Sequence, residues 1–162
     1  MNLLRQVHES LIYRVRDLMF DQGFTLDVNC RVVPTYPTDL EKTNMNIWPT
    51  IAVEVDDVFG RDVELGSREW PTMPFEIAIF AKGKGQKKDL SYAIWDNLRE
   101  QYINIYNFTT VYPNVPKDYT GIPIIGQALI DNVTISPVRE ETTIRGEQNQ
   151  SLIDGLIFLS NS

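Results

Sequence analysis

The sequence predicts an α+β protein with one mostly antiparallel sheet of four to five strands and two amphipathic helices packed on one face. Three observations lead to this expectation. Apolar residues recur at helical spacing in two segments, apolar and polar residues alternate in several others, and strands that follow one another in a chain usually pair as neighbours. Because 162 residues are enough for one hydrophobic core and too few for two, we expect a single domain over residues 1–162.

The N-terminal segment is expected to form an amphipathic helix of about five turns that begins near Leu3 and ends at Gly23. Its apolar positions are Leu3, Leu4, Val7, Leu11, Val15, Leu18 and Met19. A short β-prone run follows over residues 28–33, and prolines end it. The single cysteine, Cys30, lies in this run; it cannot form an intramolecular disulfide, and we expect a small buried thiol.

Residues 35–48 have a loop-like composition, which is typical of a surface loop or an arm. Two prolines flank Tyr36, and Thr38, Asp39, Thr43, Asn44 and Asn46 follow. Loops of this length without secondary structure of their own are uncommon unless they have a function. Two interpretations therefore stay open for this segment: an arm that contacts another molecule, or a disordered loop.

The centre of the chain predicts two strands. Residues 50–56 alternate cleanly, with two sets of side chains on opposite faces: Ile51, Val53 and Val55 on one, and Ala52, Glu54 and Asp56 on the other. After a turn at residues 59–62, a return strand is expected to begin at Val63–Leu65 and to continue over residues 75–79. Prolines between these two parts predict an edge or a bulge.

A Lys/Gly-rich turn over residues 82–88 precedes a second amphipathic helix, for which Asp89 or Ser91 is the expected N-cap. The apolar face of this helix consists of Leu90, Ala93, Ile94, Leu98, Tyr102 and Ile105. Residues 108–126 hold prolines and aromatic residues at irregular spacing and are expected to be a structured excursion.

The last two strands are expected at residues 129–135, which alternate, and at residues 152–159, which are apolar on both faces and predict a central strand. The polar stretch between them predicts a mobile loop at about residues 137–150.

Composition excludes several classes of protein. A net charge of -7 and a pI of about 4.7 argue against wrapping nucleic acid, which requires clustered lysine and arginine. The N-terminal residues carry charges and no continuous apolar run, so no signal peptide is expected. No apolar stretch approaches the roughly 20 residues of a membrane span, and we expect the protein to be made and kept in a cytoplasm.

The chain lacks the residue patterns of common catalytic sites. The turn at residues 82–88 does not match the phosphate-binding spacing GxxxxGK[ST], and His8 is the single histidine, which argues against a histidine-rich zinc site or a Ser-His-Asp triad. A nuclease-like metal site from Glu54, Asp56 and Glu76 is an open alternative, although no lysine has an acid two positions before it. The competing interpretation is a solvated acidic face of the sheet. We expect no enzyme activity and no cofactor.

Charge is unevenly distributed along the chain. Residues 50–76 hold seven acidic residues and two arginines, whereas residues 77–117 hold six basic and three acidic residues. Opposite patches on one small domain suit a head-to-tail ring, in which the basic side of one subunit meets the acidic side of the next. Alternatively, the acidic residues serve solubility alone.

The element order of the chain resembles that of the tail terminator and tail-completion (neck) proteins of long-tailed bacteriophages. The resemblance rests on the N-terminal helix, the proline-flanked arm and the core "IWPTIAVEVDD…PFEIAIFAKGKGQKKDLSYAIWDNLRE", followed by the late strands "ALIDNVTISPV" and "SLIDGLIFLSN". It spans most of the chain and is one of pattern and element order, because the family has no diagnostic motif. The excursion at residues 108–126 is longer than expected for the family.

This resemblance implies a structural virion protein that assembles in the host cytoplasm into a ring, usually a hexamer, at the head-proximal end of the tail. Its partners would be the tail tube, the sheath in some tails, and head–tail connector proteins, and DNA would pass through the lumen without specific binding. The residues expected at the lumen or tube contact are Asp56, Asp57, Asp62 and Glu64. Those expected at the subunit contact are Tyr36 and Trp48 of the arm, with Lys84, Lys87 and Lys88.

The sequence is also compatible with three alternatives: a head–tail connector or adaptor subunit, a metal-dependent nuclease-like enzyme, and a monomeric adaptor or chaperone with an apolar groove beside the first helix.

Overall fold

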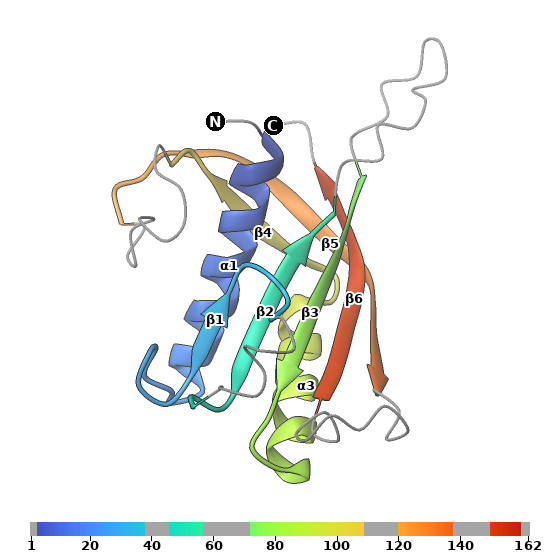
Figure 1. The fold of residues 1–162 in the computed structure, drawn as a ribbon. Coiled ribbons are helices and arrows are strands. Elements are labelled where there is room, and N and C mark those ends of the chain that lie inside the picture. The colour runs from blue at the N-terminus through green and yellow to red at the C-terminus, as the bar shows by residue number, and fades with distance from the viewer. Residues whose placement is uncertain (1–2, 38–45, 57–71, 109–119, 138–149, 160–162) are drawn as a thin grey trace.

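The protein forms one six-stranded sheet with two helices, described by a computed structural model for residues 3–37, 46–56, 72–108, 120–137 and 150–159 (Figure 1). In chain order the elements are α1 (Leu3–Asp21), β1 (Arg31–Val33), β2 (Thr50–Val55), β3 (Thr72–Phe80), α3 (Lys84–Leu98), β4 (Gln101–Tyr106), β5 (Ile124–Pro137) and β6 (Gln150–Leu159). The strand order is β1-β2-β3-β6-β5-β4. Strands β1 and β2 are parallel, and the other neighbours are antiparallel. The expected α+β class is confirmed, whereas the expectation of four to five strands is too low and the sheet is mixed.

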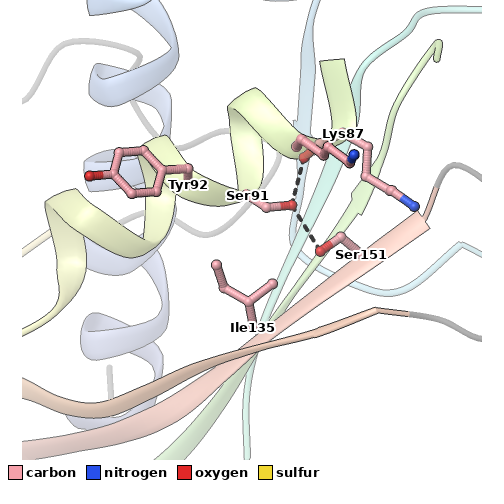
Figure 2. A pocket seen from close by; sticks show the side chains of 6 residues that line it. Lys87, Ser91, Tyr92, Ile135 and Ser151 are labelled. Carbon is pink, nitrogen blue, oxygen red and sulfur yellow. Dashed lines mark hydrogen bonds between the residues drawn. The ribbon is translucent and has the colours of Figure 1, made fainter. Parts of the chain in front are cut away.

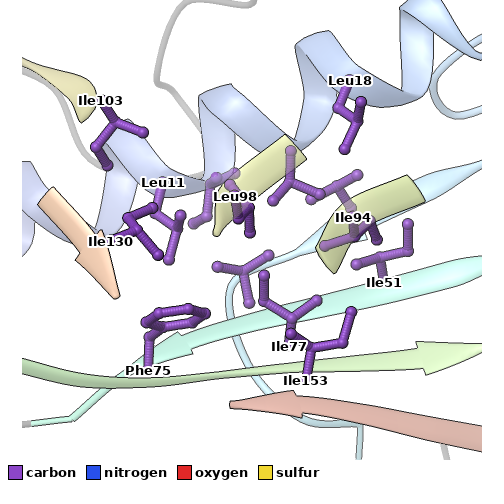
Figure 3. Packing of buried hydrophobic residues seen from close by; sticks show 14 of the residues in the cluster. Leu11, Leu18, Ile51, Phe75, Ile77, Ile94, Leu98, Ile103, Ile130 and Ile153 are labelled. Atoms are coloured by element: carbon purple, nitrogen blue, oxygen red, sulfur yellow. The ribbon is translucent and has the colours of Figure 1, made fainter. Parts of the chain in front are cut away.

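The sheet curls around α1. Helix α1 contacts β1 and β2 at one end of the strand order and β4 at the other end, while α3 contacts β3, β4, β5 and β6 (Figure 1). Side chains of both helices and of the sheet meet in a single apolar cluster (Figure 3). Its members include Leu11 and Leu18 of α1, Ile94 and Leu98 of α3, and Ile51, Ile77, Ile130 and Ile153 of the sheet. The burial of this cluster is the main force that holds the fold together.

Helix α1 ends as the sequence predicts, at Gly23. This glycine has a φ of 90°, a left-handed conformation that side chains with a Cβ rarely adopt. Its N–H donates to the Phe20 carbonyl at 3.0 Å, and the Phe24 N–H donates to the Met19 carbonyl at 3.0 Å. These two bonds form a Schellman motif, which satisfies carbonyls that the helix leaves free.

The side chains of His8 and Cys30, both in the N-terminal half of the chain, have structural roles. The Nε2 of His8 lies 2.7 Å from the Val53 carbonyl and donates to it, which ties α1 to β2 beyond the end of the short β1. Cys30 is fully buried, as the sequence predicts. Burial, and secondarily Asp27, raises the pKa of the Cys30 thiol to about 12, which keeps it in the unreactive protonated form.

The second helix begins earlier and ends earlier than expected. Its N-cap is Gly83, not Asp89 or Ser91, and it has no side-chain cap. Ser91 lies inside the helix, where its hydroxyl donates to the Lys87 carbonyl at 2.6 Å. The helix ends at Leu98 because the chain turns at Glu100, which has a φ of 56°.

The residues after this turn form β4, a strand that the sequence analysis did not predict. Tyr102 and Ile105, which were expected on the helix, therefore belong to the sheet. Strands β3, β5 and β6 contain the runs expected at residues 75–79, 129–135 and 152–159 and extend beyond them. The expectations for residues 57–71, 109–119 and 138–149 lie outside the described residues.

Candidate functional site

The face of the sheet that points away from α1 and α3, here called the outer face, has two different ends. Inward residues such as Ile51 and Ile77 are buried under the helices. Residues between them, such as Ala52 and Glu76, point outward because side chains alternate along a strand. One end of the outer face is covered by the protein's own chain, and the other end is acidic.

The covered end consists of Ala52, Ala78 and Phe80, against which Tyr36 and Trp48 pack. The Tyr36 ring meets the Phe80 ring edge-on, with centroids 5.3 Å apart. Its backbone N–H donates to Glu54 Oε1 at 2.7 Å, and its hydroxyl accepts a hydrogen bond from Gln150 Nε2. Tyr36 is thus fixed to β2, β3 and β6 together.

Tyr36 and Trp48 were expected to reach a neighbouring subunit. Within one chain both rings are half-buried and pack on the sheet of their own subunit. Their contact with a second subunit stays a prediction, and residues 38–45 of the expected arm lie outside the described residues.

At the acidic end, three carboxylates form a row across three adjacent strands. Glu54 of β2 lies directly opposite Glu76 of β3, and Glu76 lies directly opposite Asp154 of β6. We call Glu54, Glu76 and Asp154 the acid row. Although Glu76 is exposed overall, partial desolvation of its carboxyl against the sheet raises its pKa above the ordinary value, and the negative charges of Glu54, Asp154 and Asp56 raise it further. Like charges directly opposite one another destabilise a sheet, so the acid row carries an energetic cost in the isolated subunit.

The acid row borders an open hollow of about 370 Å³. Its lining is formed by Asp56, Pro74, Phe75, Glu76, Asn132, Asp154, Gly155 and Leu156. The Thr134 hydroxyl donates to Asp154, which holds that carboxylate in place at the edge of the hollow. This surface favours a positively charged or hydrogen-bond-donating partner with some apolar area.

The acid row does not have the arrangement of a metal centre. Among the described residues, no group of three or more histidine, cysteine, aspartate or glutamate side chains is placed to hold a metal ion. Of the residues expected at the lumen, Asp56 is exposed at the end of β2 and lines the hollow. Asp57, Asp62 and Glu64 lie outside the described residues. Sequence reasoning missed Asp154, although the alternation of Ile153 and Asp154 in a strand indicates that the carboxylate points outward.

The lysines expected at the subunit contact lie at the start of α3. We call Lys82, Lys84, Lys87 and Lys88 the lysine turn; three of these side chains are exposed and Lys87 is half-buried. Lys87 and Lys88 line a hollow of about 320 Å³ with Ser91, Tyr92, Ile135 and Ser151 (Figure 2). The Ser91 hydroxyl is hydrogen-bonded to the Ser151 hydroxyl at 2.8 Å and to the Lys87 carbonyl. The bond between Ser91 and Ser151 fixes α3 against β6.

The acid row makes the stability of the protein depend on pH. Because the pKa of Glu76 is higher in the folded than in the unfolded state, its negative charge destabilises the folded protein at neutral pH, and this penalty disappears as the pH falls to about 4.5. Glu76→Gln should therefore raise the free energy of unfolding at pH 7 by about 0.5 kcal/mol, and the difference from wild type should shrink at pH 5. Thermal unfolding of both proteins at pH 7 and at pH 5 measures this difference in stability.

The matched control for Glu76 is Glu100→Gln, since Glu100 is exposed on the turn before β4 and outside the acid row. A Glu76→Gln protein that is less stable than wild type at pH 7 would contradict the repulsion argument.

The described helices include none that is long and apolar enough to span a membrane. The chain matches no protein-family model, no curated protein and no solved structure.

Proposed function

We propose that the protein is a structural subunit of a long-tailed bacteriophage, a tail terminator or neck protein that forms a ring on the tail tube and joins the tail to the head. The observation that carries this proposal is the acidic end of the outer face, where Glu76 and Asp154 are exposed, together with the lysine turn on a different part of the molecule. Complementary surfaces at separate places suit repeated contact between copies of one chain.

In this role the protein acts by shape and charge and needs no cofactor. The ring would end growth of the tail tube and present a docking surface to the head–tail connector, with a sheath as a further partner in contractile tails. Acidic residues after β2, which begin at Asp56, would line the lumen and keep DNA from adhering, because like charges repel.

A connector or adaptor subunit of the same neck is the nearest alternative, since it would use the same surfaces. The nuclease-like alternative receives less support. It needs Glu54, Asp56 and Glu76 to bind a divalent metal, and the described acidic residues include no such group.

Light scattering of the purified protein over a range of protein and salt concentrations tests the proposal. We expect a species near six times the 18.6 kDa subunit mass, visible as rings by negative-stain electron microscopy, which dissociates as salt rises because salt screens exposed charges. A gold-labelled antibody should mark the head-proximal end of the tail in phage particles that carry the protein. A mass of one subunit under all conditions would contradict self-assembly, and label elsewhere on the particle would contradict the neck.

A further inference from the structure

The acid row is not neutralised by the part of the chain that the structure describes. Neither Glu54, Glu76 nor Asp154 forms a salt bridge with a described lysine, arginine or histidine. Glu76 is exposed at the centre of the row, where a positive charge from another molecule would reach all three carboxylates. Next to it, Pro74 and Leu156 are half-buried in the hollow and offer apolar area.

The lysine turn has the complementary chemistry. Four lysines fall within seven residues, and Lys88 is exposed on the first two turns of α3. Tyr92, with 60% of its surface exposed, and Ile135, with 39% exposed, supply apolar area beside the lysines (Figure 2). The hydrogen bonds of Ser91 to β6 and to the Lys87 carbonyl hold this surface rigid, which lowers the entropy cost of docking.

The acid row and the lysine turn of one subunit cannot contact each other. The acid row lies on the outer face of the sheet, whereas α3 packs on the opposite, inner face. A contact between them must therefore join two copies, and it uses different patches on the two partners. Such a heterologous contact builds a closed ring or an open chain and not a symmetric pair.

We propose that the lysine turn of one copy docks on the acid row of the next copy. Lysine side chains then neutralise the carboxylates, and Tyr92 and Ile135 cover Pro74 and Leu156. This contact rests on the proposed ring function and specifies which surfaces build the ring. A second copy fits the acid row better than nucleic acid, because phosphate would be repelled by the same carboxylates.

Two charge-reversed proteins test the contact. In Glu54→Lys/Glu76→Lys the acid row changes from three negative charges to a net charge of +1. In Lys82→Glu/Lys84→Glu/Lys88→Glu the lysine turn changes from four positive charges to a net charge of -2. Each protein alone should associate at least about tenfold more weakly than wild type, because like charges then face one another. An equimolar mixture should associate again, since each protein offers the surface that the other requires.

The matched controls are Asp21→Lys and Arg31→Glu, which reverse exposed charges outside both surfaces. Circular dichroism and thermal unfolding verify that all four variants fold. Light scattering then gives the mass of each protein and of the mixture.

The outcomes separate the contact from the ring function. Loss of association in both variants, restored by mixing and absent from the controls, supports the contact. If either variant alone still forms rings as the wild-type protein does, the proposed contact is wrong, whereas the ring function is not contradicted. Association lost in both variants but not restored by mixing overturns the direct pairing of these surfaces. A wild-type protein that is monomeric under all conditions overturns both the contact and the ring.

Discussion

Replacing Gly155 with alanine is expected to lower the free energy of unfolding by about 2 kcal/mol, because no space exists for the added methyl group. Gly155 lies directly opposite Phe75 in the β3–β6 ladder. A Cβ at this position would lie 2.8 Å from two atoms of the Phe75 ring and 3.1 Å from the Asp131 carbonyl oxygen. The ring is 2% exposed and packed in the core (Figure 3), so it has little freedom to move away.

Urea unfolding of Gly155→Ala, compared with Gly85→Ala, measures this effect. Gly85 is exposed in the first turn of α3, and a Cβ there would meet no atom within 4 Å. Alanine at this position should be neutral or should stabilise the protein by up to about 1 kcal/mol, because alanine favours a helix.

A double variant tests whether the clash is with the Phe75 ring. Gly155→Ala combined with Phe75→Leu should be more stable than the sum of the two single effects predicts, since the smaller side chain makes room. If Gly155→Ala is as stable as wild type, the close approach of Phe75 is not a constraint on the fold.

Replacing Tyr36 with alanine is expected to lower the free energy of unfolding by about 3 kcal/mol. The variant loses the edge-on contact with Phe80 and the hydrogen bond with Gln150, and it exposes the apolar end of the outer face. Tyr36→Phe retains the ring and should lose only about 1 kcal/mol with the hydroxyl.

The control for Tyr36 is Phe20→Ala, because the Phe20 side chain is 71% exposed on α1 and its loss should change stability by less than about 0.5 kcal/mol. Chemical unfolding at a salt concentration where the protein is monomeric isolates the effect within one chain. If Tyr36 serves only as a subunit contact, Tyr36→Ala will reduce association and leave the stability of the monomer unchanged.

The first helix was predictable from sequence because two independent local signals agree. Its apolar residues follow one helical face, and Gly23 supplies a left-handed end. The burial of Cys30 was predictable because a free cysteine behaves as a small apolar residue and Val28, Val32 and Val33 lie near it in the sequence.

The second helix and β4 were not predictable, because local signals conflict there. Tyr102 and Ile105 fall at helical spacing from Leu98, yet residues 101–106 also alternate, with Ile103 and Ile105 buried. The strand forms because Glu100 adopts a positive φ, which ends the helix. A positive φ is uncommon for glutamate, so the sequence does not indicate it. Gly83 and Gly85 suggested a turn, but the helix begins at Lys84. Its first turn is held by the Lys87 N–H, which donates to the Gly83 carbonyl at 3.0 Å, and by the Gln86 side chain, which accepts from the Lys82 N–H at 2.7 Å.

The acid row was predictable only in part. The alternation of β2 places Glu54 on the outer face, and the same rule applies to Glu76 and Asp154. That these three residues lie opposite one another depends on strand register, and β6 is separated from β3 by 69 residues of sequence between Phe80 and Gln150. No local signal in the sequence defines a pairing over that distance.

The curl of the sheet around α1 has a consequence for aggregation. Exposed strand edges offer unpaired N–H and C=O groups to other chains, and this promotes the growth of β-sheet aggregates. In the described part of this protein, α1 contacts both edge strands, β1 and β4. Its Ser10 hydroxyl accepts a hydrogen bond from the Tyr106 N–H at 3.0 Å, in the place that another strand would take. The helix thus occupies one backbone donor at the edge of β4, and a foreign strand that paired with β4 at this point would first have to displace Ser10.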